Sequence, residues 1–216
     1  MECIQRNGPE APRHLVEFSS LEHDGGTSDV LVIGAGVAGL AAALSAARDG
    51  VSVRVLSKAA LPETNTAYAQ GGIAAVLGRD ERSGGDSVER HVRDTLQAGG
   101  GFCDEEAVRS IVGGAGEAIA FLRGLGCRFD AGADGQVALT REGGHSQRRI
   151  LHAAGDATGR EIGRALLLAA RSEDAIELRE HCFVIDLLRH GGRVVGALAC
   201  DDSGRLHLLR ARQVIL

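Results

Sequence analysis

The stretch DVLVIGAGVAGL, Asp29 to Leu40, decides the fold that this sequence predicts. Val30 to Ile33 form a continuous apolar run, which is typical of a strand buried in a parallel sheet. A helix rich in Ala and Leu is expected from about Val37 to Arg48, with Gly50 closing it, and a second strand over 51–56. The stretch therefore opens a β-α-β unit.

The turn between this strand and helix reads Gly34-Ala35-Gly36-Val37-Ala38-Gly39, which is G-x-G-x-x-G. Gly34 permits a tight turn, Gly36 lets a pyrophosphate approach the backbone, and Gly39 lets helix and strand pack closely. The helix N-terminus then faces the anion. The motif in this context predicts a dinucleotide site, and a glycine-rich turn without a ligand is the alternative.

The end of the second strand does not identify the dinucleotide. An NAD site typically has an acidic residue there, which holds the ribose hydroxyls, but this strand ends in Leu56-Ser57-Lys58. Lys58 is compatible with the 2′-phosphate of NADP and also with an ordinary solvated lysine. These residues alone leave FAD and NADP open.

Composition narrows the class of protein. The chain has 216 residues and a net charge of −5, with no basic stripe, which argues against nucleic acid as the main partner. The five cysteines are scattered without a C-x-x-C pair, so we expect no metal site and no disulfide framework, and a cytoplasmic location. No apolar run is long enough to span a membrane, and the N-terminus lacks a signal-peptide core.

The rest of the chain predicts an α/β, Rossmann-like domain with a helical insertion and a β-meander. Residues 1–27 are polar and aperiodic and are expected to be a disordered leader, with the domain over 28–216. Asp86-Ser87 and Asp104 are expected to cap helices reaching about Ala98 and Leu122. Thr158 and Glu161 have capping-box spacing at the start of another helix, and short strands with glycine turns follow from residue 176.

Three further segments carry a family resemblance. They are Ser57-Lys58, the uncharged run TNTAYAQGGIAAVLG (64–78) and LTREGGHSQRRILHAAGDATGRE (139–161). In this order and spacing they resemble the L-aspartate oxidases, a branch of the flavoprotein family that also holds the succinate dehydrogenase and fumarate reductase flavoprotein subunits. The resemblance covers about residues 29–216.

The resemblance implies FAD as cofactor, with the strand-end lysine beside the adenosine ribose and the A-Q-G-G segment along the flavin. A histidine that holds the flavin covalently in the succinate dehydrogenase branch is replaced here by Asn65, which implies non-covalent FAD. The cofactor-binding positions carried over are Gly34, Ala35, Gly36, Val37, Ala38, Gly39, Lys58, Asn65, Thr66, Ala67, Tyr68, Ala69, Gln70, Gly71, Gly72 and Val184.

The resemblance implies that Glu142 takes part in substrate recognition. The dicarboxylate branch typically has an aromatic residue there, and a carboxylate would repel a dicarboxylate unless the ligand also carried an ammonium group, as L-aspartate does. We therefore expect Glu142 to orient the substrate amino group. The alternative is a loop acid paired with Arg141, Arg148 or Arg149. The roles of His145, Arg148 and Arg149 stay open.

The implied enzyme oxidises L-aspartate to iminoaspartate with O2 or fumarate as electron acceptor. This is the first step of quinolinate and NAD biosynthesis, which implies a functional link to quinolinate synthase. Family members are longer, and this chain stops in the apolar run Val214-Ile215-Leu216. We therefore expect a truncated piece without the capping and C-terminal helical domains, inactive or nearly inactive alone and binding FAD poorly.

Three other interpretations remain at this point. One is a fragment of a fumarate reductase or succinate dehydrogenase flavoprotein. Asn65 and Glu142 argue against it. Another is an NADP-binding Rossmann module in which Lys58 reads the 2′-phosphate. The third is a non-catalytic remnant that keeps the core for partner binding.

Overall fold

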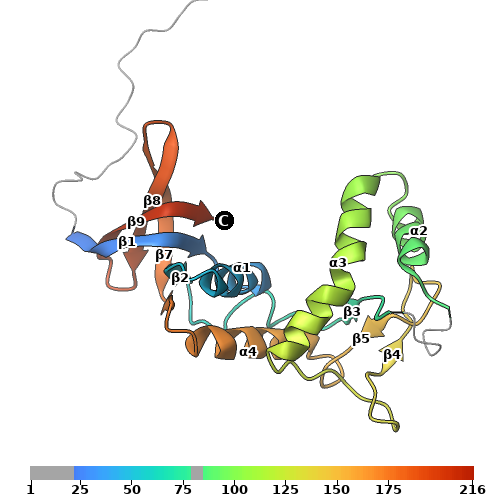
Figure 1. Ribbon diagram of the computed structural model, residues 1–216. Helices are drawn as coiled ribbons and strands as arrows, with labels where there is room; N and C mark the ends of the chain where they lie inside the picture. Colours follow the sequence, from blue (N-terminus) through green and yellow to red (C-terminus); the bar gives the residue numbers. More distant parts are fainter. Residues whose placement is uncertain (1–21, 79–84) are drawn as a thin grey trace, which may run out of the picture.

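A six-stranded sheet forms one part of the molecule, and a smaller three-stranded sheet with two helices forms the other (Figure 1). The structure is a computed structural model that describes residues 22–78 and 85–216. The large sheet has the strand order β6-β2-β1-β9-β8-β7. Its strands are β1 (Glu22–Ile33), β2 (Val53–Leu56), β6 (Ile176–Arg179), β7 (Cys182–His190), β8 (Arg193–Asp201) and β9 (Leu206–Ile215).

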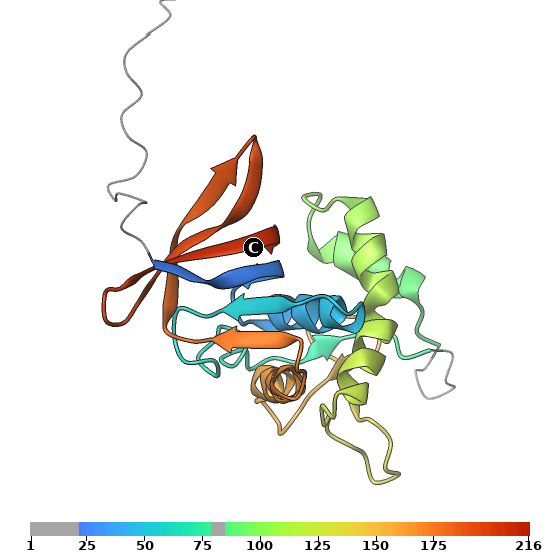
Figure 2. The ribbon, with the colours of Figure 1, turned by 60° about the vertical axis from the view of Figure 1, so that its left-hand side comes forward.

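The parallel half of the large sheet is the predicted β-α-β unit extended on both sides. β1 pairs in parallel with β2 and with β9, and β2 pairs in parallel with β6. Helices α1 (Val37–Arg48) and α4 (Thr158–Arg171) pack against each other beside these strands (Figure 2). The expected Rossmann-like class is confirmed.

The antiparallel half is the predicted meander. β7, β8 and β9 pair in sequence order, with register shifts in the β7–β8 ladder that bend the strands. The sheet curls so that β7 approaches β2. Leu31 and Leu56 are thereby buried against Cys182, Ala197 and Leu209.

The smaller part contains the expected helical insertion and a sheet that the sequence did not predict. Helices α2 (Val88–Ala98) and α3 (Glu105–Gly124) pack on each other. The sheet has the order β3-β5-β4 and is antiparallel, with β3 (Ile73–Ala74), β4 (Leu139–Thr140) and β5 (Ile150–Leu151). Strands of two residues carry no readable periodicity in the sequence.

Two sequence expectations need correction. β1 begins at Glu22, so the ordered domain starts before residue 28; residues 1–21 of the expected leader lie outside the described part. Thr158 does not cap α4, because its hydroxyl accepts the N–H of Ala153 at 3.1 Å. Glu161 does not complete a capping box either, since its carboxylate accepts the N–H of Arg128 at 2.8 Å.

The other two caps are confirmed. Ser87 accepts the N–H of Arg90 at 3.2 Å at the start of α2, and Asp104 accepts the N–H of Ala107 at 2.9 Å at the start of α3. Each side chain satisfies a backbone donor that the first helical turn leaves free.

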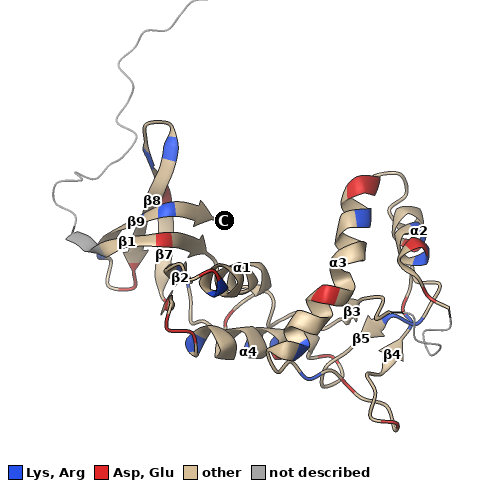
Figure 3. Ribbon diagram, viewed as in Figure 1, with Lys and Arg blue, Asp and Glu red and all other residues tan. Residues whose placement is uncertain are grey.

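Acidic and basic residues are interspersed over both parts of the molecule (Figure 3). Within the described residues, no helix has the length and apolar character needed to cross a bilayer. In the same ranges, no group of three or more His, Cys, Asp or Glu side chains is placed to hold a metal ion. Cys103, Cys127, Cys182 and Cys200 are free thiols.

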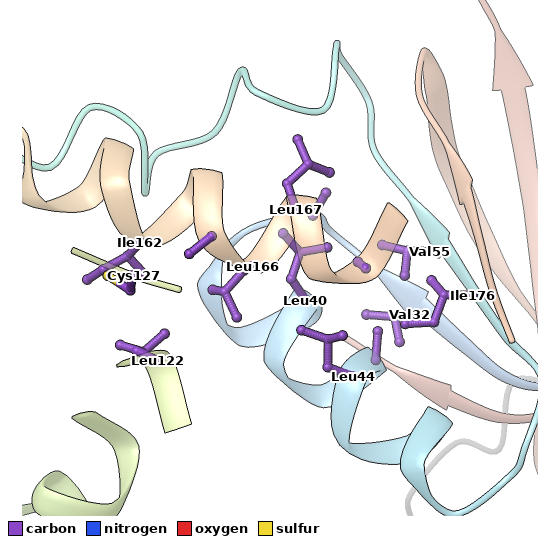
Figure 4. Close-up of a cluster of buried hydrophobic side chains, with 14 of the residues drawn as sticks. Val32, Leu40, Leu44, Val55, Leu122, Cys127, Ile162, Leu166, Leu167 and Ile176 are labelled. Carbon is purple, nitrogen blue, oxygen red and sulfur yellow. The ribbon is translucent and has the colours of Figure 1, made fainter. Parts of the chain in front are cut away.

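The main hydrophobic core lies between the parallel strands and the two helices (Figure 4). Val32 and Val55 point to this side of the sheet, whereas their neighbours Leu31 and Leu56 point to the other, as strand alternation requires. Leu40 from α1 and Leu166 from α4 fill the space between the helices. This packing fixes the start of α1 relative to the ends of β1 and β2.

Candidate functional site

The turn from β1 into α1 has the geometry that its glycines predict. Gly34 has φ +114°, a conformation that side chains disfavour, and its N–H donates to the Leu56 carbonyl at 2.8 Å. A Cβ on Gly39 would lie 1.9 Å from the Gly34 carbonyl oxygen. Gly34 is therefore required by the turn and Gly39 by the close packing of helix on strand.

Thr66 from the uncharged segment closes over the start of α1. Its hydroxyl accepts the N–H of Val37 at 3.0 Å, while Gly36, the N-cap, has no capping side chain. A Cβ on Gly36 would lie 3.5 Å from the Thr66 hydroxyl oxygen, which is ordinary contact. The helix end, with its partial positive charge, thus lies beside residues 64–66.

A cavity of about 360 Å³, here called the strand-end cavity, opens where β1 and β2 end. It brings together predicted positions from four places in the chain: the glycine turn, Lys58, Asn65-Thr66, and Val184 on β7. Its full lining is Ile33, Gly34, Ala35, Gly36, Leu56, Ser57, Lys58, Glu63, Thr64, Asn65, Thr66, Cys182, Phe183 and Val184. Ligands bind at this edge of open α/β sheets, outside the carboxyl ends of the strands.

Sequence reasoning missed two notable members of this cavity. Glu63 supplies an acid, although not at the strand end where one was sought. Its carboxylate accepts a hydrogen bond from the Tyr68 hydroxyl, and this bond raises the pKa of Tyr68. Phe183 is 57% exposed beside the cavity and offers an aromatic face. Neither residue belongs to a local motif that would have marked it.

The remaining predicted positions of the uncharged segment lie outside the strand-end cavity. Tyr68 is 68% exposed, and Ala69, Gln70 and Gly71 are exposed as well. The Ala69 carbonyl accepts the N–H of Gly159, whose added Cβ would lie 1.9 Å from the Thr66 carbonyl oxygen. The segment therefore rests on the first turn of α4.

Gly71 and Gly72, both expected to allow approach of the flavin, differ. A Cβ on Gly71 would meet nothing within 4 Å. One on Gly72 would lie 2.2 Å from Ile150 Cγ2 and 2.9 Å from His152 Cε1. Gly72 is thus required by packing against β5, a reason that the sequence did not reveal.

Among residues 22–78 and 85–216, Glu142 has no ion pair with Arg141, Arg148 or Arg149, the partners that the alternative interpretation expected. Its half-exposed carboxylate lies 3.1 Å from His152 Nε2, which is also 3.0 Å from the Thr140 hydroxyl oxygen. A carboxylate attracts this nitrogen only when the nitrogen carries a proton, so the contact requires the Nε2–H form of His152. His152 thereby holds Glu142 beside the end of β4.

Arg149, whose role the sequence left open, is a buried anchor. Its guanidinium is fully buried, donating to Asp86 at 2.8 and 2.6 Å and to Asp94 at 2.5 Å. Nη1 also lies 3.2 Å from His145 Nδ1, which must accept because arginine has no acceptor. These contacts tie α2 and Asp86, the residue before its N-cap, to the start of β5.

Asp94 also holds the loop that follows Glu142. The N–H and hydroxyl of Ser146 both donate to it at 2.8 Å. Burial alone would raise the pKa of Asp94, but these bonds and the Arg149 guanidinium outweigh it and lower the pKa to about 2. Asp94 is therefore ionised at neutral pH and anchors the loop.

A glycine-rich strand-helix turn beside a cavity at the strand ends defines a dinucleotide-binding domain of the Rossmann-like class. Across residues 29–216 the sequence matches the FAD binding domain family, and the chain belongs to that family. FAD is accordingly its cofactor. The site fits this group, because Gly34 and Gly36 present backbone without a side chain in the wall of the strand-end cavity.

Curated relatives come from bacteria and plants. The chain is 51% identical over 190 residues to the L-aspartate oxidase of Mycobacterium tuberculosis, covering 88% of this chain and 34% of that protein. It is 48% identical over 170 residues to the Streptomyces coelicolor L-aspartate oxidase (78% and 28%) and 51% over 179 residues to the chloroplastic rice enzyme (83% and 25%). The chain thus spans between a quarter and about a third of the length of these relatives.

Solved structures of related flavoproteins share the fold. The Mycobacterium smegmatis Sdh1 complex in the apo form superposes with a TM-score of 0.81 at 29% identity, over 87% of this chain and 33% of that one. An E. coli quinol fumarate reductase gives 0.79 at 31% identity, over 88% and 32%.

Proposed function

We propose that this chain supplies the FAD-binding part of an L-aspartate oxidase. The observation that carries the proposal is the 51% identity with a curated L-aspartate oxidase over 190 residues. FAD held by the residues of the strand-end cavity would supply the two-electron acceptor for oxidising L-aspartate to iminoaspartate, with O2 or fumarate as the final electron acceptor.

The strand-end cavity is the proposed site of the ADP half of FAD. The backbone of Gly34 to Gly36 and the N-terminus of α1 would hold the pyrophosphate. Lys58 would lie by the adenosine ribose and Val184 by the adenine, with the exposed Phe183 ring available to stack on the base. Their meeting in one cavity supports this assignment.

The uncharged segment 65–72 is the proposed flavin platform. The exposed backbone around Gln70 and Gly71 leaves room for a planar ring system. Asn65 has an amide where covalent attachment needs a histidine, so FAD is held non-covalently. The segment carries no charge that would compete with a reduced flavin.

Glu142 is the proposed partner of the substrate ammonium group. Its carboxylate is half-exposed and lies 3.1 Å from His152 Nε2, and the Thr140 hydroxyl in turn holds the His152 ring. A single carboxylate so placed distinguishes aspartate from succinate, because it would be repelled by a ligand that has only carboxylates. The reaction would take place in the cytoplasm, in line with the free thiols, and would feed quinolinate synthase.

The test is a spectral titration of the FAD-loaded chain. We expect L-aspartate to perturb the flavin absorbance at lower concentration than succinate, and Glu142→Gln to remove or reverse that preference. Glu89→Gln, which changes an exposed acid on α2, is the matched control and should behave as wild type. Failure to bind FAD refutes the cofactor assignment, whereas equal responses to both ligands refute the role of Glu142 and favour a dicarboxylate enzyme of the fumarate reductase kind.

A further inference from the structure

A second cavity, here called the α1–α4 cavity, lies between the two helices that cover the large sheet. Its volume is about 390 Å³, within the range of small-molecule sites. Leu40 of α1, Leu167 of α4 and Leu61 of the connecting segment contribute its apolar walls, with several alanines. Leu40 and Leu167 face each other in the core beside it (Figure 4).

The wall of this cavity contains one more cationic side chain than anionic side chains. Glu161 and Arg164 neutralise each other through bonds of 2.7 Å. Arg160 also lines the cavity and is exposed, and no partner for its guanidinium occurs among residues 22–78 and 85–216. The first turn of α4, which adds partial positive charge, has no side-chain cap.

We propose that the α1–α4 cavity binds an amphipathic monocarboxylate, with its apolar chain between the helices and its carboxylate at Arg160. Apolar walls with a single free cation suit a ligand with one charged end. They do not suit a small dicarboxylate, whose second charge would be buried without a partner. The site is therefore distinct in chemistry from that of the proposed substrate.

The cavity is coupled to the proposed FAD site through a shared wall. Ala35, Thr64 and Thr66 line both cavities. The hydroxyl of Thr66 accepts the N–H of Val37, which lines the α1–α4 cavity. A ligand there contacts the groups that shape the turn of the strand-end cavity, so any change in FAD affinity is matched by an equal change in ligand affinity.

Gly163 offers a way to fill the cavity without disturbing the fold. It lines the cavity in the middle of α4, and an added Cβ would meet nothing within 4 Å. Replacing a helical glycine also favours the helix. Gly113 in α3 is equally unobstructed and does not line the cavity, so Gly113→Leu is the matched control for Gly163→Leu.

The experiment is calorimetric titration of the chain with octanoate, with and without FAD. We expect wild type and Gly113→Leu to bind alike, Gly163→Leu to bind at least tenfold more weakly, and Arg160→Gln to bind roughly two- to fivefold more weakly. Octylammonium should not bind where octanoate saturates.

Octanoate should still bind when FAD is present. Absence of octanoate binding to wild type, equal binding to Gly163→Leu, or equal binding of octylammonium would overturn the proposal. Simple competition with FAD would also overturn it, because the cavity would then be part of the cofactor site. The FAD titration itself tests the proposed function separately, since it needs no octanoate.

Discussion

Replacement of Arg149 by methionine is expected to destabilise the fold by about 3–5 kcal/mol, the cost of removing one partner from a buried ion pair. Most of that cost falls on Asp86, whose side chain is 1% exposed and loses two bonds, of 2.8 and 2.6 Å. Asp94 is 12% exposed and keeps both bonds from Ser146, so it contributes less. The loss is a large share of the roughly 5–15 kcal/mol by which a typical domain is stable.

The assay is urea unfolding followed by far-ultraviolet circular dichroism, with Arg148→Met as control. Arg148 is exposed, so its variant should stay within about 0.5 kcal/mol of wild type. Adding Asp86→Leu to Arg149→Met should recover much of the loss, because no uncompensated charge then stays buried. The reasoning fails if Arg149→Met costs less than about 1 kcal/mol, or if the double variant is no more stable than the single one.

Three further outcomes are expected. The pKa of Asp94 is lowered to about 2 from an ordinary 3.8, so this group contributes stability above pH 3.8 that is lost as pH falls toward 2. Asp94→Asn should therefore flatten the fall in Tm between pH 5 and 2.5, and an unchanged slope would contradict this. Gly39→Ala forces a Cβ to within 1.9 Å of the Gly34 carbonyl oxygen and should cost about 1–3 kcal/mol and weaken FAD binding, whereas Gly163→Ala should do neither. Acid precipitation should release all the flavin absorbance into the supernatant, because Asn65 cannot bond to it covalently, and a yellow pellet would show otherwise.

The parts of the fold that could be predicted are those whose signal is local. The β1-turn-α1 unit combines an apolar strand, a glycine motif and an alanine-rich helix, and the caps at Ser87 and Asp104 depend on neighbouring N–H groups. The start of β1 at Glu22 could not be predicted, because it depends on pairing with β9, from the far end of the chain. The capping box at Thr158 failed for a similar reason, since tertiary partners took its hydroxyl.

The sequence motifs of the candidate site could be predicted, but the contacts between residues distant in sequence could not. Lys58, Asn65 and Val184 line one cavity, and their roles toward FAD stay predictions. Phe183 and Glu63 gave no signal of their own, because what marks them is the strand-end cavity, which segments distant in sequence form together. Sequence patterns report spacing along the chain, whereas these roles depend on strand pairing.

The small sheet explains how the two family-like motifs can act together. The uncharged segment runs into β3 and the Glu142 loop follows β4, and both strands pair with β5, where Ile73 and Leu139 flank Leu151. Two strand spacings of about 4.8 Å, roughly 10 Å in all, therefore separate β3, which follows the flavin platform, from β4, which precedes the proposed substrate loop. His152 follows β5 in the middle, with its ring against Gly72 on one side and Glu142 on the other. A side chain larger than hydrogen at residue 72 would crowd this ring as well as Ile150, so we propose that Gly72 also influences the position of the proposed substrate carboxylate.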